Sequence, residues 1–145
     1  MVNVYVSEGM TQAFTVEGAA VKVGDAVHLN AAGTISKADD SKGFIGVVEG
    51  ASFKGKYSGI PGTAYTQGEV AVGDLATVRM KGLVKCLVYT GSNTGAGAVV
   101  IADSGNPGGV VSAAGTEFTA RLIGTSLDAV TGTSAGAEVR VLLLR

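Results

Sequence analysis

The sequence predicts one small all-β domain. Three observations support this: apolar and polar residues alternate in short runs, 23 glycines separate those runs, and no apolar pattern of helical period continues between two caps. The charged content of 16% is low and the apolar content of 46% is high, a combination that argues against a disordered chain. The length of 145 residues fits a single domain with its own core.

The pentad Val-x-Val-Gly-Asp occurs twice, at residues 21–25 and again at 70–74, and an alternating run follows each copy. Glycine accepts positive φ at little cost, and an aspartate can hydrogen-bond the backbone two residues further on, so both copies predict tight turns. The expected turn residues are Gly24, Asp25, Gly73 and Asp74. Two copies predict a compact barrel-like or clip-like body of two related halves, because a solenoid needs at least three repeats.

Short strands are predicted throughout the first half of the chain. In order they are 2–6, 14–16, 21–23, 26–29, 34–37 and 44–50, rich in β-branched residues and bounded by turn residues. Gly46 lies inside the last of these runs, which indicates a bulge or a close approach of two backbones. Residues 52–64 contain aromatic residues among glycines and are predicted to form a loop.

The second half repeats this style. Its predicted strands are 69–72, 75–80, 83–89, 117–124 and 138–144. Lys81-Gly82 separates two alternating runs, and this is the strongest hairpin signal in the chain. Residues 90–116 are rich in Gly, Ala, Ser and Asn, with one short strand at 99–101, and are expected to form a Gly-rich surface loop inserted into the domain.

Several classes of function are disfavoured by composition. A formal net charge of −1 lacks the basic surplus of a nucleic-acid-binding protein, and no apolar stretch reaches the length of a membrane span. The single cysteine, Cys86, cannot form an intrachain disulfide and is expected to be buried in a strand. The low charge and high apolar content of a chain without a membrane span suggest an oligomer.

No pattern indicates catalysis, a cofactor or a metal. The single histidine, His28, is expected on the exposed face of a strand, opposite Val27 and Leu29, with no nucleophile at triad spacing. Asp39 and Asp40 lack the alternating oxygen ligands of a calcium loop, so a solvated loop is expected there. One histidine and one cysteine cannot form a Cys/His zinc set. We therefore expect a protein that is not an enzyme.

A series of short motifs runs in a fixed order along the chain. They are Tyr5-Val6-Ser7-Glu8-Gly9, Phe14-Thr15-Val16, the Gly18 to Val27 segment with Gly24-Asp25, then Ile45-Gly46-Val47, Val72-Gly73-Asp74 and the closing Val139-Arg140-Val141-Leu142-Leu143. Their order and spacing resemble the tailed-phage capsid decoration (cement) proteins. The resemblance covers most of the chain except 90–116.

That resemblance implies a small β-tulip or β-clip-like barrel, similar to the lambda-type head-stabilising proteins. Residues 1–16 would form an extended N-terminal arm and first strand, and 17–145 a single β domain. The family binds as a homotrimer at three-fold sites on the outer surface of an icosahedral phage head and stabilises it against internal DNA pressure. Made in the host cytoplasm, such a protein becomes part of the virion without direct contact to nucleic acid or membrane.

The major capsid protein would be the partner of the arm, which adds a strand to a neighbouring capsid sheet. The arm residues expected to bind it are Val2, Asn3, Val4, Tyr5, Val6 and Glu8. An ordinary first strand inside the domain remains the alternative for this segment. For the whole chain, the alternatives are an adhesion or carbohydrate-binding β module, a trimeric nucleotide hydrolase of clip architecture, and a domain of a larger protein. Eight Phe and Tyr residues and no Trp offer little for sugar stacking.

Overall fold

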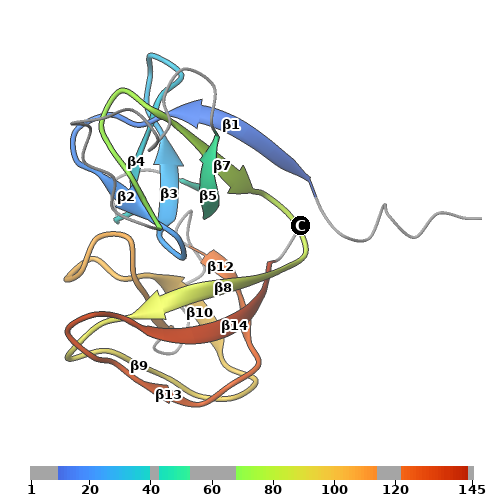
Figure 1. The fold of residues 1–145 in the computed structure, drawn as a ribbon. Helices are drawn as coiled ribbons and strands as arrows, with labels where there is room; N and C mark the ends of the chain where they lie inside the picture. Colours follow the sequence, from blue (N-terminus) through green and yellow to red (C-terminus); the bar gives the residue numbers. More distant parts are fainter. Residues whose placement is uncertain (1–9, 40–42, 53–67, 114–121, 144–145) are drawn as a thin grey trace, which may run out of the picture.

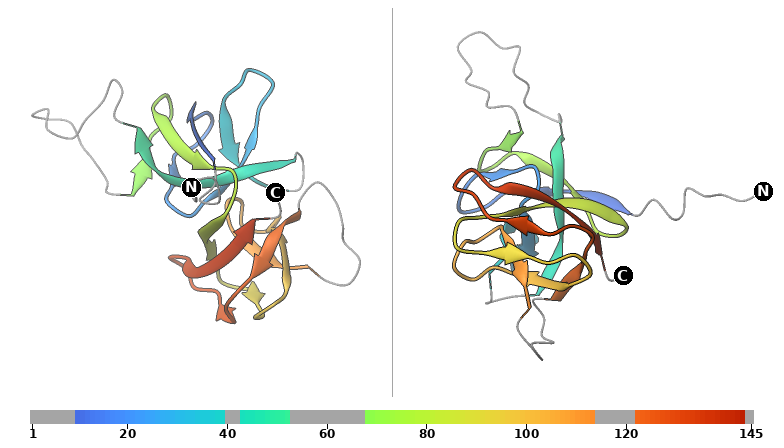
Figure 2. Two further views of the ribbon diagram at one scale, coloured as in Figure 1. Left: turned by 90° about the vertical axis from the view of Figure 1, so that its right-hand side faces the viewer. Right: turned by 90° about the horizontal axis from the view of Figure 1, so that it is seen from below.

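The computed structural model describes residues 10–39, 43–52, 68–113 and 122–143. These residues form fourteen strands and no helix, so the predicted all-β class is confirmed. The strands are arranged in two lobes, one made from β1 to β7 and the other from β8 to β14 (Figure 1). The same division is visible from the side, in the left view of Figure 2.

The first lobe is a curved five-stranded antiparallel sheet whose two ends meet at a single point. The strand order is β1-β7-β5-β3-β4, and a parallel bridge between Val16 and Ile35 joins its two outer strands. A separate β2-β6 pair completes the lobe. The elements are β1 (Thr11–Thr15), β2 (Val21–Lys22), β3 (Ala26–Leu29), β4 (Ile35–Lys37), β5 (Phe44–Ser52), β6 (Glu69–Val70) and β7 (Leu75–Arg79). This lobe is therefore barrel-like, whereas the repeat predicted a barrel-like or clip-like body for the whole chain.

The two pentads pair with each other inside this lobe. Val21 lies opposite Val70 in the β2-β6 ladder, and each pentad ends in a turn whose glycine has positive φ. Each turn also exchanges two backbone hydrogen bonds with a buried valine, Val48 for the first copy and Val16 for the second. The two related segments therefore do not form two halves of the molecule, because they pair with each other within one lobe. The second lobe contains neither pentad, which corrects the expectation of a repeat that spans the chain.

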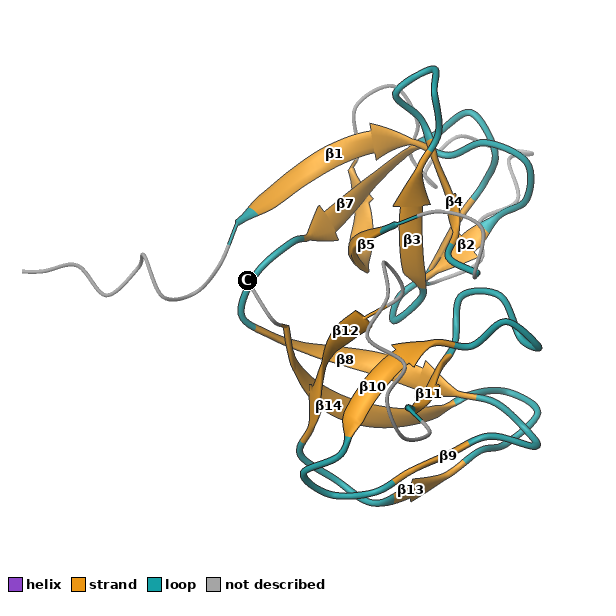
Figure 3. Cartoon of the chain, turned by 180° about the vertical axis from the view of Figure 1, so that it is seen from behind, coloured by secondary structure: helices purple, strands orange, loops and turns teal. Residues whose placement is uncertain are grey.

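The second lobe contains a five-stranded antiparallel sheet of order β11-β10-β12-β14-β8 and a β13-β9 pair. Its elements are β8 (Leu83–Val88), β9 (Asn93–Thr94), β10 (Val99–Ala102), β11 (Val110–Ser112), β12 (Leu122–Ser126), β13 (Val130–Thr131) and β14 (Ala137–Leu143). The predicted hairpin at Lys81-Gly82 is wrong. β7 pairs with β1 and β5, β8 pairs with β14, and residues 80–82 cross between the lobes (Figure 3).

The expected surface loop at 90–116 is also corrected. Its described part contains β9, β10 and β11, and β10 lies between β11 and β12 in the second sheet. Val100 and Val110 are fully buried. The small residues of this segment resembled a loop in composition, but its apolar runs supply an edge strand, β11, and the strand next to it, β10, of the second sheet. Residues 114–116 lie outside the described part.

Two clusters of buried apolar side chains form the cores of the lobes. One fills the first lobe and consists of Val16, Val21, Val27, Ile35, Val48, Val70, Ala76 and Val78. The other fills the second lobe and includes Val84, Cys86, Val100, Ile123, Val139 and Val141, joined by Ala26, Ala38, Phe44 and Val47 from the first lobe. The expected burial of Cys86 is confirmed. Because apolar side chains of both lobes share the second cluster, the lobes form one packed body.

His28 is buried, which corrects the expectation of an exposed histidine. Alternation along β3 places Val27 in the first cluster and Ala26 in the second, so both faces of this strand are covered. His28 points to the same side as Ala26, because side chains two residues apart share a face. Leu29, at the end of the strand, is exposed instead. A strand covered on both faces cannot be distinguished from a half-buried strand by alternation alone.

Candidate functional site

The outer edge of β1 is the first candidate surface. β1 pairs along its whole length with β7, from Thr11 opposite Arg79 to Thr15 opposite Leu75. Among the strands that the structure describes, none pairs with the other side of Thr11–Thr15. Thr11, Gln12 and Ala13 are exposed. Such an edge presents backbone donors and acceptors that a further strand can use. The expected arm, Val2 to Glu8, precedes this edge and lies outside the described residues.

The first pentad turn lies at the junction of the lobes. Asp25 is fully buried, its Oδ2 accepts the backbone N–H of Lys22 at 2.8 Å, and its Oδ1 lies 3.4 Å from the Tyr89 hydroxyl. Asp25 therefore accepts the amide three residues before it in the chain. The sequence instead predicts a hydrogen bond to the backbone two residues after it. Burial raises the pKa of Asp25, and the Lys22 amide with the charges of Lys37 and Lys22 opposes that rise.

Asp25 and its neighbours join the two lobes through the backbone as well. The N–H of Ala26 donates to Gly108 O at 2.8 Å, and the N–H of Gly108 donates to Ala38 O at 3.0 Å. Tyr89 directly follows β8, so its contact with Asp25 also crosses the junction. Burial and the nearby Asp25 carboxylate raise the pKa of Tyr89. These hydrogen bonds join the two lobes at the first pentad turn.

A polar hollow of about 380 Å³ lies beside this junction, lined by Lys22, Lys37, Glu69, Tyr89 and Asn106 with neighbouring residues. Lys22 Nζ is engaged within the chain, because it donates to Ala135 O at 3.0 Å and lies 5.1 Å from the centre of the Tyr89 ring. The Asn106 side chain donates to Asp103 Oδ2 at 3.0 Å. The side chains of Lys22 and Asn106 therefore already bind other parts of the chain.

The remaining reactive side chains are dispersed. His28 Nδ1 lies 3.8 Å from Asp39 Oδ1, and burial raises the pKa of Cys86 to about 12. Ser92 donates to Asp103, whose carboxylate also accepts the N–H of Gly105 at 3.0 Å and so holds a loop. Across the described ranges, no group of three or more His, Cys, Asp or Glu residues could hold a metal ion.

The outer face of the second sheet exposes several large apolar side chains. Leu83 of β8 lies opposite Leu142 of β14, and the two are 51% and 48% exposed. Leu127, just after β12, is 42% exposed, and its N–H donates to Arg140 O at 2.9 Å. We call Leu83, Leu127 and Leu142 the leucine face. Sequence alternation could have found two of them, since Leu83 and Leu142 each stand beside a buried valine.

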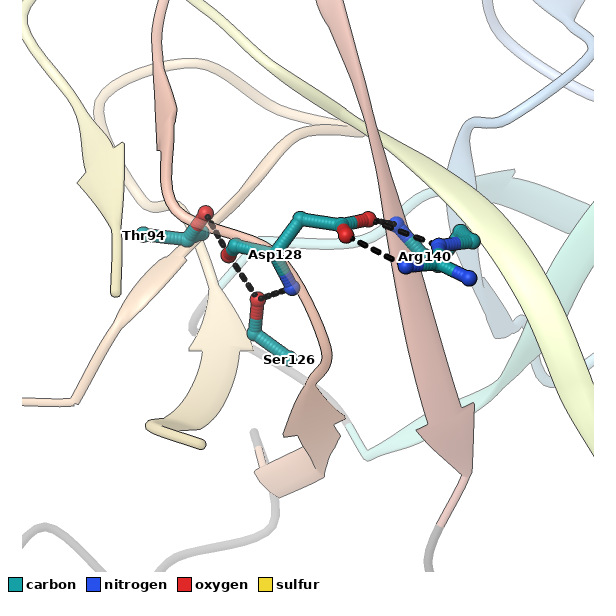
Figure 4. Close-up of polar contacts among 4 residues, drawn as sticks. All are labelled: Thr94, Ser126, Asp128 and Arg140. Carbon is teal, nitrogen blue, oxygen red and sulfur yellow. Dashed lines mark hydrogen bonds and ion pairs between the residues drawn. The ribbon is translucent and has the colours of Figure 1, made fainter. Parts of the chain in front are cut away.

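The charged residues next to the leucine face are paired within the chain. Arg140 Nη2 lies 2.7 Å from Asp128 Oδ1, and Arg140 Nε lies 3.0 Å from Oδ2 (Figure 4). The hydrogen bonds from Arg140 lower the pKa of Asp128 to about 2. Ser126 and Thr94 donate to the backbone oxygen of Asp128 and fix this residue in place. Lys85 Nζ lies 3.8 Å from Glu138 Oε1.

A second hollow, of about 320 Å³, borders the leucine face on the β8 side. Its apolar lining is Val23, Val47, Val48, Leu83 and Val84, and Glu49, Lys85 and Arg140 complete it. Val23 belongs to the first pentad turn and is 41% exposed. We call this the side hollow. The turn at Gly24 therefore has two roles: it contacts Leu87 of the second lobe and it places Val23 at the side hollow.

No protein-family model matches the chain, and no curated protein matches it. Among solved structures, the chain is similar to the crystal structure of the N base of the head fiber gp8.5 in bacteriophage phi29. The two are 18% identical with a TM-score of 0.49, and the match covers 93% of this chain and 95% of that one.

The four expected turn residues are all described, and only the first pair reaches the junction of the lobes. Gly24 and Asp25 are buried there, whereas Gly73 is exposed. Motif reasoning missed the leucine face and the side hollow, because neither has a spacing pattern of its own. Within the described residues, no helix is long and apolar enough to cross a membrane.

Proposed function

We propose that this chain is a capsid decoration protein: a non-enzymatic virion component that binds the outer surface of a phage head as a homotrimer. Its partner is the major capsid protein, and its sites are the three-fold positions of the shell. It needs no cofactor, and it is made in the host cytoplasm before it joins the head. The ordered motifs of the sequence, from Tyr5 to Leu143, support this proposal.

The observation that carries the proposal is the position of β1. The proposed arm, residues 2–8, lies just before this strand in the sequence, and β1 has one paired side and one open side among the described strands. An alternating, β-branched segment joined to an edge is suited to strand addition, in which backbone hydrogen bonds supply affinity and alternate side chains supply specificity. In this proposal, residues 1–16 are the arm and first strand, and 17–145 form the body.

Three linked arms would make a weak contact strong. Once one arm of a trimer is bound, the other two bind at high local concentration, which raises avidity by about 10²–10⁴ without new contacts. A trimer bound across several capsid subunits would oppose their separation under DNA pressure. Low charge suits this role, because binding then depends on backbone hydrogen bonds and apolar contact and should change little with salt.

Binding to heads of the source phage, stripped of this protein, tests the proposal. We expect deletion of residues 1–8 to abolish co-sedimentation with expanded heads while the oligomer survives in light scattering. A sharper pair is Val4→Pro and Val4→Thr. Proline removes a backbone donor and should abolish binding, whereas β-branched threonine should retain it. Full binding of the deletion variant would rule out the arm mechanism, and binding to a glycan array instead of heads would favour an adhesion module.

A further inference from the structure

We propose that the capsid strand that pairs with the arm continues along the body and pairs with Thr11 and Ala13 on the outer edge of β1. This deepens the proposed function, on which it rests for the capsid partner, by extending the contact from the arm to two residues of the folded domain. A domain bound through its own edge strand is held in one orientation, whereas an arm alone would leave the domain free to turn.

The ladder between β1 and β7 determines which backbone groups of β1 point outward. In an antiparallel pair, residues that exchange hydrogen bonds alternate with residues whose N–H and C=O point away from the partner strand. The N–H of Met80 donates to Met10 O at 2.7 Å, in register with the ladder, so the even-numbered residues of β1, such as Gln12, bond to β7. The backbone groups of Thr11 and Ala13 therefore point to the side on which no described strand pairs.

The open part of this edge is short and begins close to the arm. Val16 forms a parallel bridge with Ile35, so β4 closes the edge at that point. The N–H and C=O groups of Thr11 and Ala13 lie before the bridge, which leaves two donors and two acceptors for an added strand. Since a strand advances about 3.3 Å per residue, a capsid strand paired with residues 2–8 needs only a short continuation to reach them.

The burial along β1 is that of a strand that lacks one neighbour. Gln12 lies opposite Val78, and Val78 is fully buried, whereas Gln12 is exposed. Phe14 lies opposite the fully buried Ala76 and is only partly buried against the first cluster. Neighbouring strands of a sheet lie about 4.8 Å apart, so a strand added at the open edge would cover the outer flank of both side chains.

An uncharged extended strand is the partner that suits this edge. Residues 11–15 carry no charge, and Arg79, which lies opposite Thr11, is paired with Glu49. Binding would therefore come from backbone hydrogen bonds and from apolar contact with Phe14. A second copy of the chain fits this edge less well, because pairing of β1 with β1 would be isologous and would give a dimer in place of the proposed trimer.

Head binding of Thr11→Pro and Thr11→Val tests this edge. Proline removes the N–H of Thr11 but spares the ladder with β7, because edge strands tolerate proline where the N–H points outward. Valine keeps the N–H and the β-branched shape. We expect T11P to bind stripped, expanded heads about tenfold or more weakly, since a capsid carbonyl loses its donor, and T11V to bind as the wild type does. Equal binding by T11P and the wild type would overturn the inference.

Hydrogen exchange keeps the test valid if T11P fails to fold. In the free protein, the amides of Thr11 and Ala13 should exchange fast, whereas those of Gln12 and Phe14 should be protected by β7. On expanded heads, the amides of Thr11 and Ala13 should become protected as well, and unchanged exchange there would contradict the inference.

The two proposals fail separately. Normal head binding by T11P, together with loss of binding on deletion of residues 1–8, would confine the contact to the arm and remove only this inference. Full head binding by the deletion variant would instead rule out the arm mechanism of the proposed function.

Discussion

Arg140 holds the Asp128 carboxylate through three of its nitrogen atoms. The guanidinium supplies Nη2 at 2.7 Å and Nε at 3.0 Å, and the main-chain N–H adds a third hydrogen bond at 3.1 Å. Asp128 follows β12 and Arg140 lies within β14, so this contact reinforces a strand pair of the second sheet. A forked, charge-assisted contact of this kind is more specific in geometry than an ordinary surface ion pair.

Replacing Arg140 should raise the pKa of the Asp128 carboxyl toward the value of a free aspartate. The pKa of Asp128 is about 2 in the folded chain, against about 3.9 for a free aspartate. The ionised carboxylate therefore stabilises the fold at pH values above the pKa of the unfolded chain. That stabilisation is lost as the pH falls through the folded value. In R140Q, we expect a carboxyl NMR titration to give Asp128 a pKa well above 2. Lys85→Gln is the control and should leave it near 2; no change in R140Q would contradict the assignment.

Asp25 should produce the opposite pH dependence. Burial raises its pKa, so the folded chain favours the protonated form, and the contribution of this group to stability falls as the pH rises above about 4. Asp25→Asn keeps an oxygen that can accept the Lys22 N–H but cannot ionise. Thermal unfolding from pH 4 to neutrality should therefore show Tm of the wild type decreasing relative to D25N. Parallel curves for the two proteins would refute a raised pKa at Asp25.

The two pentad glycines offer a matched pair of substitutions. Both have positive φ, 97° at Gly24 and 90° at Gly73, so an alanine costs about 1–2 kcal/mol of backbone strain at either position. At Gly24 a Cβ would also lie 2.9 Å from Leu87 Cγ, whereas at Gly73 it would meet nothing within 4 Å. Urea unfolding should show a larger loss of stability in G24A than in G73A. Equal losses would mean that Leu87 moves aside without cost.

Gly46 and Gly50 form a second pair, within one strand. A Cβ at Gly46 would lie 2.5 Å from Arg79 O, as expected for a glycine placed where two backbones approach closely, whereas a Cβ at Gly50 would meet nothing within 4 Å. We expect G46A to cost about 3 kcal/mol or more, since β5 and β7 must separate, and G50A to stay within about 0.5 kcal/mol. Denaturant midpoints of both variants measure this. A G46A midpoint equal to that of wild type would show that the strands adjust freely.

The local sequence pattern predicts where the strands lie better than it predicts which strands pair. Alternation located β3, β5, β7, β8 and β14 to within a few residues, and Gly followed by Asp located both pentad turns. Lys81-Gly82 misled because a turn signal between two alternating runs says only that the chain bends there. Which strand then pairs with which depends on two separate cores, and nothing local in the sequence encodes that division.

Burial on both faces was also hidden from local pattern. His28 alternates with Val27 as in a half-exposed strand, but a second lobe covers the other face of β3. The sequence predicts a short strand at 99–101 but places it in a surface loop of small residues, and yet β10 lies inside the second sheet. For the candidate surfaces, the sequence indicated the arm through family resemblance. The leucine face became visible only once β8, β12 and β14 were placed side by side.

The sharing of Ala26, Ala38, Phe44 and Val47 with the second cluster has a consequence for biogenesis. Each lobe is one contiguous stretch of chain, so the strands β1 to β7 are complete before β8 leaves the ribosome. Domains of this size generally fold as they emerge, N-terminal part first. We therefore expect the first lobe to fold first and the later strands to pack against it, and a product that begins at β8 would lack the four first-lobe side chains that complete the second cluster.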